Sequence, residues 1–273
     1  MSTADIAPGQ AADTAPSGTV TVDHSHDGLV ATVLIDRAAK LNALTLEMLA
    51  ELENRLDEIA TSSARVVLVR TAGAKVFCVG ADIAAFSRLS PADMWRRWIA
   101  VGHRVFDRLA RLPQPTIAVV DGLAVGGGLE LALACDLRIA DRNARFGLPE
   151  VGLGTIPGWG GTARLTALVG ASRAKELILT GRQIDAATAD NWGLVNSVAF
   201  DQLDNAVDQY VTDLLGSAPI AQQVAKQLVD AAAAGAPAAI LESIGSGFTA
   251  HTDDFAAGVE AFLTKTAPRF QAR

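Results

Sequence analysis

Short runs of β-branched and aliphatic residues alternate with amphipathic helical patterns through the first 150 residues of the chain. Such runs, bounded by turn residues, are typical of strands that are buried on both faces of a sheet. Strands that alternate with helices pair in parallel, because a helix returns the chain to the same edge of the sheet. The sequence therefore predicts an α/β fold. The expected strands are Val20–Asp23, Leu29–Ile35, Arg65–Arg70, Thr116–Val120 and Leu137–Ala140, the first two joined by a turn at His24–Gly28.

Helices are expected between these strands. Thr45 can cap a helix in which leucines and an isoleucine recur at helical spacing from Leu46 to Ile59. The clearest amphipathic helix spans Pro91–Leu112, and its arginines fall on a face away from the apolar stripe, as in a solvated surface. A short apolar helix is expected to follow the three glycines Gly126–Gly128 and to run through Ala134.

After Gly160 the pattern becomes mostly helical. We place a boundary near residue 200, between an α/β core of residues 19–200 and a helical C-terminal segment of residues 201–273. Residues 1–18 are rich in Ala, Thr, Pro, Ser and Gly and are interpreted as a disordered tail. The expected later helices are Thr162–Val169, Ser172–Leu179, Ala186–Trp192, Leu203–Leu215, Ala221–Ala234 and Asp253–Lys265.

Composition excludes several classes of protein. The 273 residues are 50% apolar and 19% charged, which is typical of a chain with a sizeable core rather than a disordered one. No apolar run reaches the roughly 18 residues of a membrane helix. The net charge of −7 gives no basic footprint for nucleic acid. Cys78 and Cys135 form no CxxC pair and are expected to be reduced core residues of a cytoplasmic protein.

Three consecutive glycines, Gly126–Gly128, come directly before a predicted helix. Glycines let a ligand approach the backbone closely, and the first N–H groups of a helix carry partial positive charge. This arrangement suits a developing oxyanion, although tight packing of a strand on a helix explains the glycines equally well. The GxGxxG fingerprint of dinucleotide-binding proteins is absent here.

Two glutamates near these glycines are candidate catalytic groups. Glu130 lies among Leu129, Leu131 and Ala132, and a carboxylate in such surroundings either is paired, takes part in chemistry or complements the helix dipole. Glu150 precedes a glycine-rich run, where a catalytic carboxylate and an ordinary exposed one are both common. Their spacing of twenty residues does not by itself bring the two side chains together.

Three segments, Phe77–Ile83, Asp121–Asp136 and Phe146–Gly161, taken together resemble the crotonase family, the enoyl-CoA hydratase/isomerase superfamily. The resemblance extends over about residues 20–272 and is specific because the motifs recur in the right order and spacing. The matching motifs are Lys40–Leu44 (KLNAL), Gly80–Ile83, Gly126–Glu130, Pro149-Glu150, Gly154–Gly161 and Ala261-Phe262-Leu263.

The resemblance implies a spiral of ββα units, a helical C-terminal trimerisation segment, and an acyl-CoA thioester as the ligand. It places the two oxyanion-binding N–H groups on Ala81 and Gly127, and the catalytic carboxylates on Glu130 and Glu150. Two departures stand out: Lys265–Arg269 is less basic than in many relatives, and Trp159 replaces a small residue. The implied CoA-binding residues are Arg37, Lys40, Asn42, Ala43, Gly80, Asp82, Ile83 and Lys265, although Arg37 and Lys40 could equally be solvated surface charges. The candidate acyl pocket is formed by Phe86, Trp98, Pro157 and Trp159, and the rings of Phe86, Trp98 and Trp159 fit the core as well as a pocket.

Because both glutamates are retained, the resemblance favours an enoyl-CoA hydratase, in which Glu150 supplies the proton to the α-carbon and Glu130 helps to activate water. No metal and no separate cofactor are expected, since coenzyme A is part of the substrate. The expected assembly is a homotrimer or a dimer of trimers, without nucleic-acid or membrane partners. The alternatives are a double-bond isomerase or another acyl-CoA activity of this family and, more distantly, an RNA-binding module or a pseudo-enzyme.

Overall fold

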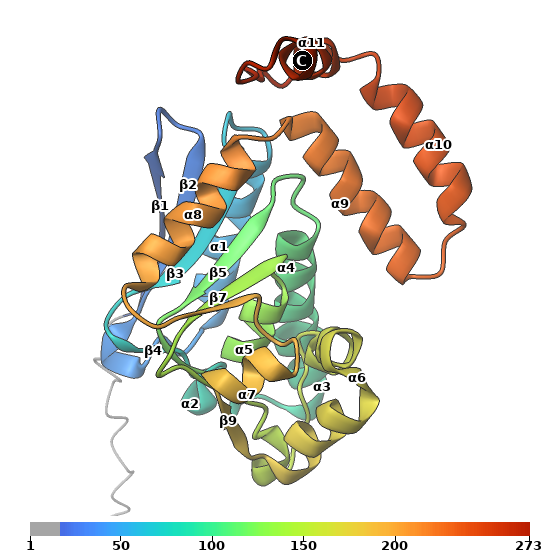
Figure 1. Ribbon diagram of the computed structural model, residues 1–273. Coiled ribbons are helices and arrows are strands. Elements are labelled where there is room, and N and C mark those ends of the chain that lie inside the picture. The colour runs from blue at the N-terminus through green and yellow to red at the C-terminus, as the bar shows by residue number, and fades with distance from the viewer. Residues whose placement is uncertain (1–16) are drawn as a thin grey trace, which may run out of the picture.

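The computed structural model describes residues 17–273, so nearly all of the predicted N-terminal tail lies outside the described residues. A six-stranded sheet in the order β1-β2-β3-β5-β7-β10 forms the centre of the α/β core (Figure 1). The first two strands form the predicted antiparallel hairpin, and all later neighbours pair in parallel, as the alternation of strands and helices predicts. Its strands are β1 (Thr19–Ser25), β2 (Val30–Asp36), β3 (Val66–Thr71), β5 (Thr116–Val120), β7 (Leu137–Asp141) and β10 (Ser197–Ala199).

A second sheet of four strands, in the order β4-β6-β8-β9, was not predicted from the residue pattern. The strands β4, β6 and β8 each follow directly after a strand of the large sheet, which produces the repeated ββα units of the spiral. Each contains three or four residues, too few for a periodic hydrophobic pattern to be recognised. The strands are β4 (Lys75–Cys78), β6 (Gly122–Val125), β8 (Arg145–Gly147) and β9 (Gln183–Asp185).

Two helices, α1 (Leu46–Ala60) and α4 (Ala100–Ala110), pack against each other. Thr45 caps α1 as predicted, its Oγ1 accepting a hydrogen bond of 3.3 Å from the Met48 N–H. The predicted helix 91–112 consists of the short turn α3 (Pro91–Asp93), a π-helical segment η2 (Met94–Ile99) and α4. Its arginines lie on the surface: Arg104 pairs with Glu53 at 2.7 Å and Arg108 pairs with Asp57 at 2.6 Å, both across to α1.

The remaining helices of the core agree with prediction except for three short ones. The two helices expected at 162–179 are present as the two parts of α6 (Gly161–Thr180), which is kinked at Gly170, whose φ is 79°. Gly170 takes up the left-handed region that interrupts helical geometry, so the sequence correctly marks the break. The predicted helices α5 (Gly127–Leu133) and α7 (Ala186–Asn191) are also present. Three short helices were not predicted: η1 (Ala38–Lys40), α2 (Ile83–Phe86) and η3 (Glu150–Leu153).

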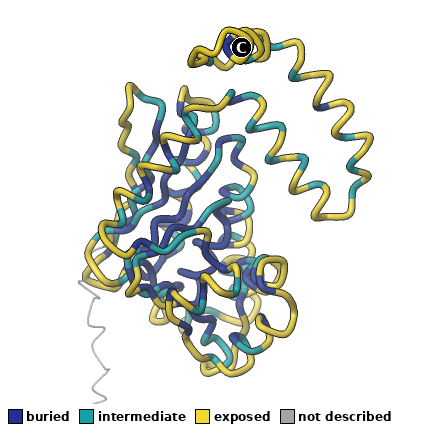
Figure 2. The backbone as a smooth tube through the Cα atoms, in the orientation of Figure 1, coloured by how far each residue is buried: buried dark blue, intermediate teal, exposed yellow. Residues whose placement is uncertain are grey.

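The C-terminal segment begins with α8 (Leu203–Leu215), which packs on the large sheet through Val207 and Val211 and so completes the core. The helices α9 (Pro219–Ala233), α10 (Ala238–Thr249) and α11 (Asp253–Thr264) then extend away from it (Figure 1). We call α9–α11 the arm. The helix α10 was not predicted, and Figure 2 shows that the arm is largely exposed. No helix in the described part of the chain combines the length and the apolar composition of a membrane span.

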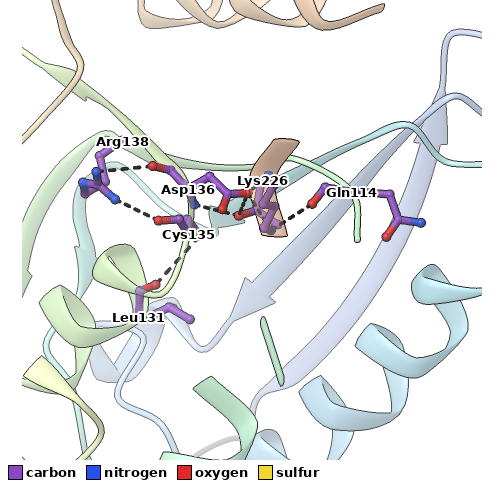
Figure 3. Close-up of polar contacts among 7 residues, drawn as sticks. Gln114, Leu131, Cys135, Asp136, Arg138 and Lys226 are labelled. Atoms are coloured by element: carbon purple, nitrogen blue, oxygen red, sulfur yellow. Dashed lines mark hydrogen bonds and ion pairs between the residues drawn. The ribbon is translucent and has the colours of Figure 1, made fainter. Parts of the chain in front are cut away.

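A partly buried ion pair anchors the arm to the core (Figure 3). Lys226 of α9 donates to the Asp136 carboxylate at 2.8 Å and to the Gln114 carbonyl at 3.2 Å. The same Asp136 oxygen accepts hydrogen bonds of 2.7 and 2.9 Å from the backbone N–H and the hydroxyl of Thr116. Arg138 donates to the carbonyls of Cys135 and Asp136. The end of α5, the start of β5 and the arm therefore meet at one charged junction.

We expect Lys226→Ala to lower the free energy of unfolding by about 1–3 kcal/mol, because charge-assisted hydrogen bonds are lost from a site that water reaches poorly. Urea unfolding at constant pH measures the change. Lys175→Ala removes an exposed lysine of α6 and is the matched control, with an expected change within about 0.5 kcal/mol. Equal stability of both variants would mean that the junction does not stabilise the fold.

Candidate functional site

A cavity of about 140 Å³ opens between the start of α5, the segment before α2, the π-helical segment η2 and the loop that precedes α6. Ala81, Gly127, Glu130 and Glu150, the four residues predicted to carry the chemistry, all line it. Most of the other lining side chains are apolar, so that water is scarce around the two carboxyl groups. The second sheet, which the residue pattern did not predict, positions these residues, because β4 and β6 lead directly into the segments of Ala81 and Gly127.

Two backbone N–H groups in this cavity donate to no acceptor among residues 17–273. Ala81 pairs with Leu44 in a parallel bridge in which Leu44 N–H donates to the Gly80 carbonyl at 2.7 Å and Asp82 N–H to the Leu44 carbonyl at 2.9 Å. Alternation along an extended segment directs the Ala81 N–H to the opposite side. Gly127 is the first residue of α5, where an N–H has no intrahelical acceptor.

Gly80 holds the two N–H groups close together. Its φ of 92° lies in the left-handed region, and a Cβ at this position would lie 2.6 Å from the Gly127 nitrogen. Any side chain would push the Ala81 segment away from the start of α5. The two N–H groups of the predicted oxyanion site therefore lie close together beside the cavity, and the binding of an oxyanion there stays a prediction.

Arg37, Asn42 and Asp82, predicted as CoA-binding residues, support the Ala81 segment from behind. The Arg37 guanidinium is buried and donates to the Asp82 carboxylate at 2.7 Å and to the Ala43 carbonyl at 3.0 Å. Asn42 is buried, and its side-chain amide donates to the carbonyls of Ala72 and Phe77. These contacts fix the backbone beside the Ala81 N–H, and contacts of these three residues with a nucleotide stay a prediction.

Glu130 lies on α5 with only 2% of its surface exposed. Its Oε1 accepts hydrogen bonds of 2.8 Å from the backbone N–H groups of both Trp159 and Gly161. Burial raises the pKa of Glu130, and these amide hydrogen bonds oppose the rise. Gly161 is required at this contact, since a Cβ there would lie 2.8 Å from the Glu130 Cγ.

Glu150 begins η3 and faces the same cavity from the opposite segment. Both of its carboxylate oxygens are buried without a hydrogen-bond partner in the described part of the chain. Burial, together with a smaller contribution from the nearby Glu130 charge, raises the pKa of Glu150 to about 7. Glu150 can therefore hold or release a proton near neutral pH, which is the property of a general acid or base.

Three of the four residues predicted for the acyl pocket, Phe86, Trp98 and Trp159, line the cavity, and Pro157 does not. Ile83, predicted to bind CoA, also lines it and is half-exposed. The binding of an acyl chain in this cavity stays a prediction. Trp95, another aromatic residue of the same helical pattern, is 70% exposed and also does not line it. Residues that the sequence analysis did not assign to the site also line the cavity: Val79, Met94, Ile99, Leu153, Thr155 and Ile156.

The predicted basic contacts lie away from the two carboxylates. Lys40 ends the turn η1 and is exposed. Lys265 follows α11, which lies at the opposite end of the molecule from α2 (Figure 1). Lys265 therefore does not reach the cavity of its own chain. Both cysteines are free and buried, as predicted, and burial raises the pKa of each thiol to about 12. Residues 17–273 contain no cluster of three His, Cys, Asp or Glu side chains suited to a metal.

Comparisons with known proteins identify relatives that all carry the name enoyl-CoA hydratase or a closely related one. A family model described as enoyl-CoA hydratase/isomerase matches residues 26–273. A short-chain-enoyl-CoA hydratase from Clostridium acetobutylicum is 43% identical over 75% of this chain and 78% of its own. A crotonyl-CoA hydratase from Syntrophomonas wolfei is 38% identical over 88% of this chain and 94% of its own. The crystal structure of an enoyl-CoA hydratase from Bacillus anthracis superposes with a TM-score of 0.88 at 35% identity, covering 93% of this chain and 99% of that one.

The buried, unpartnered Glu150 predicts a pH-dependent gain in stability for Glu150→Gln. Its pKa is raised from 4.5 to about 7, so the native state binds more protons than the unfolded state between these values, and stability falls as the pH rises through this window. Because glutamine stays neutral, we expect the variant to be about 1–2 kcal/mol more stable than the parent at pH 8.5, allowing for screening by solvent, and nearly equal at pH 5. Chemical unfolding at both pH values measures this; a gain of equal size at pH 5 would contradict it.

Proposed function

We propose that this chain, which belongs to the enoyl-CoA hydratase/isomerase family, adds water across the double bond of a trans-2-enoyl-CoA to give a 3-hydroxyacyl-CoA. The observation that carries the proposal is the placement of two buried carboxyl groups, Glu130 and Glu150, on one apolar cavity beside two free backbone N–H groups. The hydratase names of the relatives support the same reaction.

The two N–H groups stabilise the charge that develops during the reaction. Attack of water on the β-carbon moves electron density through the conjugated system onto the thioester oxygen. Ala81 N–H and Gly127 N–H donate to this enolate oxygen, and because both are fixed in the backbone they need no reorganisation. The loss of one such donor typically lowers the rate about 10²–10³-fold.

Each of the two carboxyl groups carries out one of the two proton transfers, from the water and to the α-carbon. Glu130 is held by two backbone hydrogen bonds to one oxygen, which leaves its other oxygen to orient the attacking water and accept its proton. Glu150, with a pKa of about 7, supplies the proton that the α-carbon takes up. The β-carbon gains the hydroxyl of the water and the α-carbon gains one proton, so one molecule of water is added without any oxidation or reduction. Glu130 then releases the proton that it accepted and Glu150 takes up a proton in its place, which restores the starting state. Coenzyme A enters only as part of the substrate.

The CoA moiety extends from the open edge of the cavity. Ile83 lies half-exposed at this edge, and Lys40, Ala43 and Gly80 belong to the two paired segments beside it. We propose that the exposed backbone and the Lys40 ammonium contact the nucleotide part of the substrate. Lys265 can contribute only from a neighbouring subunit, because α11 of the same chain lies at the far end of the molecule.

We expect Glu150→Gln to lower the kcat for hydration of crotonyl-CoA about 10²–10⁴-fold, since the amide cannot deliver the proton. The loss of enoyl-thioester absorbance measures the rate. Glu47→Gln alters an exposed glutamate of α1 and is the matched control, with an expected rate close to the parent's. Undiminished hydration by Glu150→Gln would contradict the assigned role. Conversion of a 3-enoyl-CoA to its 2-enoyl isomer without hydration of either compound would indicate the isomerase instead.

We also propose that the arm joins three copies of the chain. Its exposed apolar side chains include Ile240, Ile244 and Phe248, spaced four residues apart along one face of α10, and Phe255 and Phe262 on α11. Exposed apolar side chains in such number are typical of a subunit interface. A homotrimer, or a pair of trimers, would bury it.

Light scattering should therefore give three or six times the mass of one chain, and Phe248→Lys should shift the protein toward smaller species. A charge within the apolar contact would be buried without a partner, which disfavours association. Leu179→Lys changes an equally exposed side chain of α6, outside the arm, and should leave the mass unchanged. A monomeric parent protein at micromolar concentration would contradict the proposed assembly.

A further inference from the structure

We propose that the Trp159 ring is the end wall of the acyl cavity and restricts the enzyme to short 2-enoyl groups. This inference rests on the proposed hydratase function and adds the substrate class to it. The indole lines the cavity and is itself only 2% exposed, so it separates the reaction site from the core behind it.

The ring lies between two helices that have no side chain at the points of contact. A Cβ at Gly102 of α4 would lie 2.2 Å from the indole Nε1, and a Cβ at Gly127 of α5 would lie 2.6 Å from its Cζ3. Glycine destabilises the interior of a helix, so its presence at position 102 is best explained by the space that the ring takes. The indole thus extends from α4 to the oxyanion donor of α5 and closes the cavity in that direction.

Other aromatic side chains hold the ring in this position. The Trp98 ring lies 5.9 Å from it and the Phe106 ring 5.3 Å from it in an edge-on arrangement. The indole N–H donates to the Trp98 carbonyl at 3.4 Å. A ring fixed on several sides does not move aside at low cost when a longer acyl chain enters.

The side chain of Trp159 lines the cavity, whereas its backbone contacts the catalytic carboxylate. Its backbone N–H, not its side chain, donates to Glu130 at 2.8 Å. Substitution of the side chain therefore leaves the donor to the catalytic carboxylate in place. A change in the preferred acyl length can consequently be measured apart from the loss of the catalytic group.

Truncation of the ring would open apolar space that is continuous with the cavity. Engineered cavities lined by apolar side chains stay dry and bind apolar molecules. Each methylene that moves from water into such space improves binding about fourfold. A longer acyl chain should therefore gain relative to a short one when Trp159 is replaced by a small residue.

The test compares crotonyl-CoA with trans-2-decenoyl-CoA as substrates of the full-length parent, Trp159→Ala and Trp159→Phe. We expect the parent to favour the four-carbon substrate in kcat/KM. The ten-carbon to four-carbon ratio should rise at least tenfold in Trp159→Ala and by a smaller factor in Trp159→Phe. Trp192→Ala removes a tryptophan outside the cavity, which stacks with Arg173 instead, and should leave the ratio within twofold of the parent's.

Calorimetric binding of butyryl-CoA and decanoyl-CoA to the same proteins gives a readout that does not depend on turnover, and the same shift in preference is expected. A ratio unchanged in both Trp159 variants, or a parent that prefers the ten-carbon substrate, would overturn this inference while leaving the hydratase proposal intact. Failure of the parent to hydrate either substrate would overturn the proposed function and this inference with it.

Discussion

The two hydrogen bonds that Glu130 accepts from the backbone of Trp159 and Gly161 fix α5 relative to the segment that begins α6. A carboxylate this deeply buried needs such donors, and here they come from the loop that precedes α6 and from the first residue of α6. The same two bonds connect this loop to α5, whose first N–H is one of the two donors that we propose for the oxyanion. The loop also carries the indole ring that lines the cavity. The burial of the Glu130 carboxyl group, the position of the proposed oxyanion site and the shape of the cavity thus depend on one pair of amide contacts.

The large sheet could be predicted from the sequence because its main strands contain five to seven residues rich in β-branched side chains. The small sheet could not, since strands such as Arg145–Gly147 are too short to show a period and depend on pairing with distant segments. Helix α10 was missed although Ile240, Ile244 and Phe248 recur at helical spacing, because the glycines and serines between them are also typical of loops.

The candidate site could be predicted mainly through the family resemblance. The spacing of Glu130 and Glu150 says nothing about proximity, and it is the strands β7 and β8 between them that return the chain to the same cavity. Residue type alone also could not separate a ligand-binding arginine from a structural one, and Arg37 is buried in an ion pair with Asp82. For Trp159 the sequence left the choice between pocket and core open, and the ring belongs to both.

The π-helical segment Met94–Ile99 lets one continuous helix face two different environments. A π-helical turn contains one residue more than an α-helical turn, which rotates everything after it by about 100°. Within the π-helical segment, Met94 and Trp98 line the cavity; after it, Val105 and Leu109 lie in the core. A deletion of one residue in this segment would restore ordinary helical winding and turn either the cavity wall or the core face toward solvent. The shape of the cavity along this helix can therefore change in evolution only by substitution of side chains. An insertion or deletion in the helix would misalign the face that lines the cavity with the face that packs in the core.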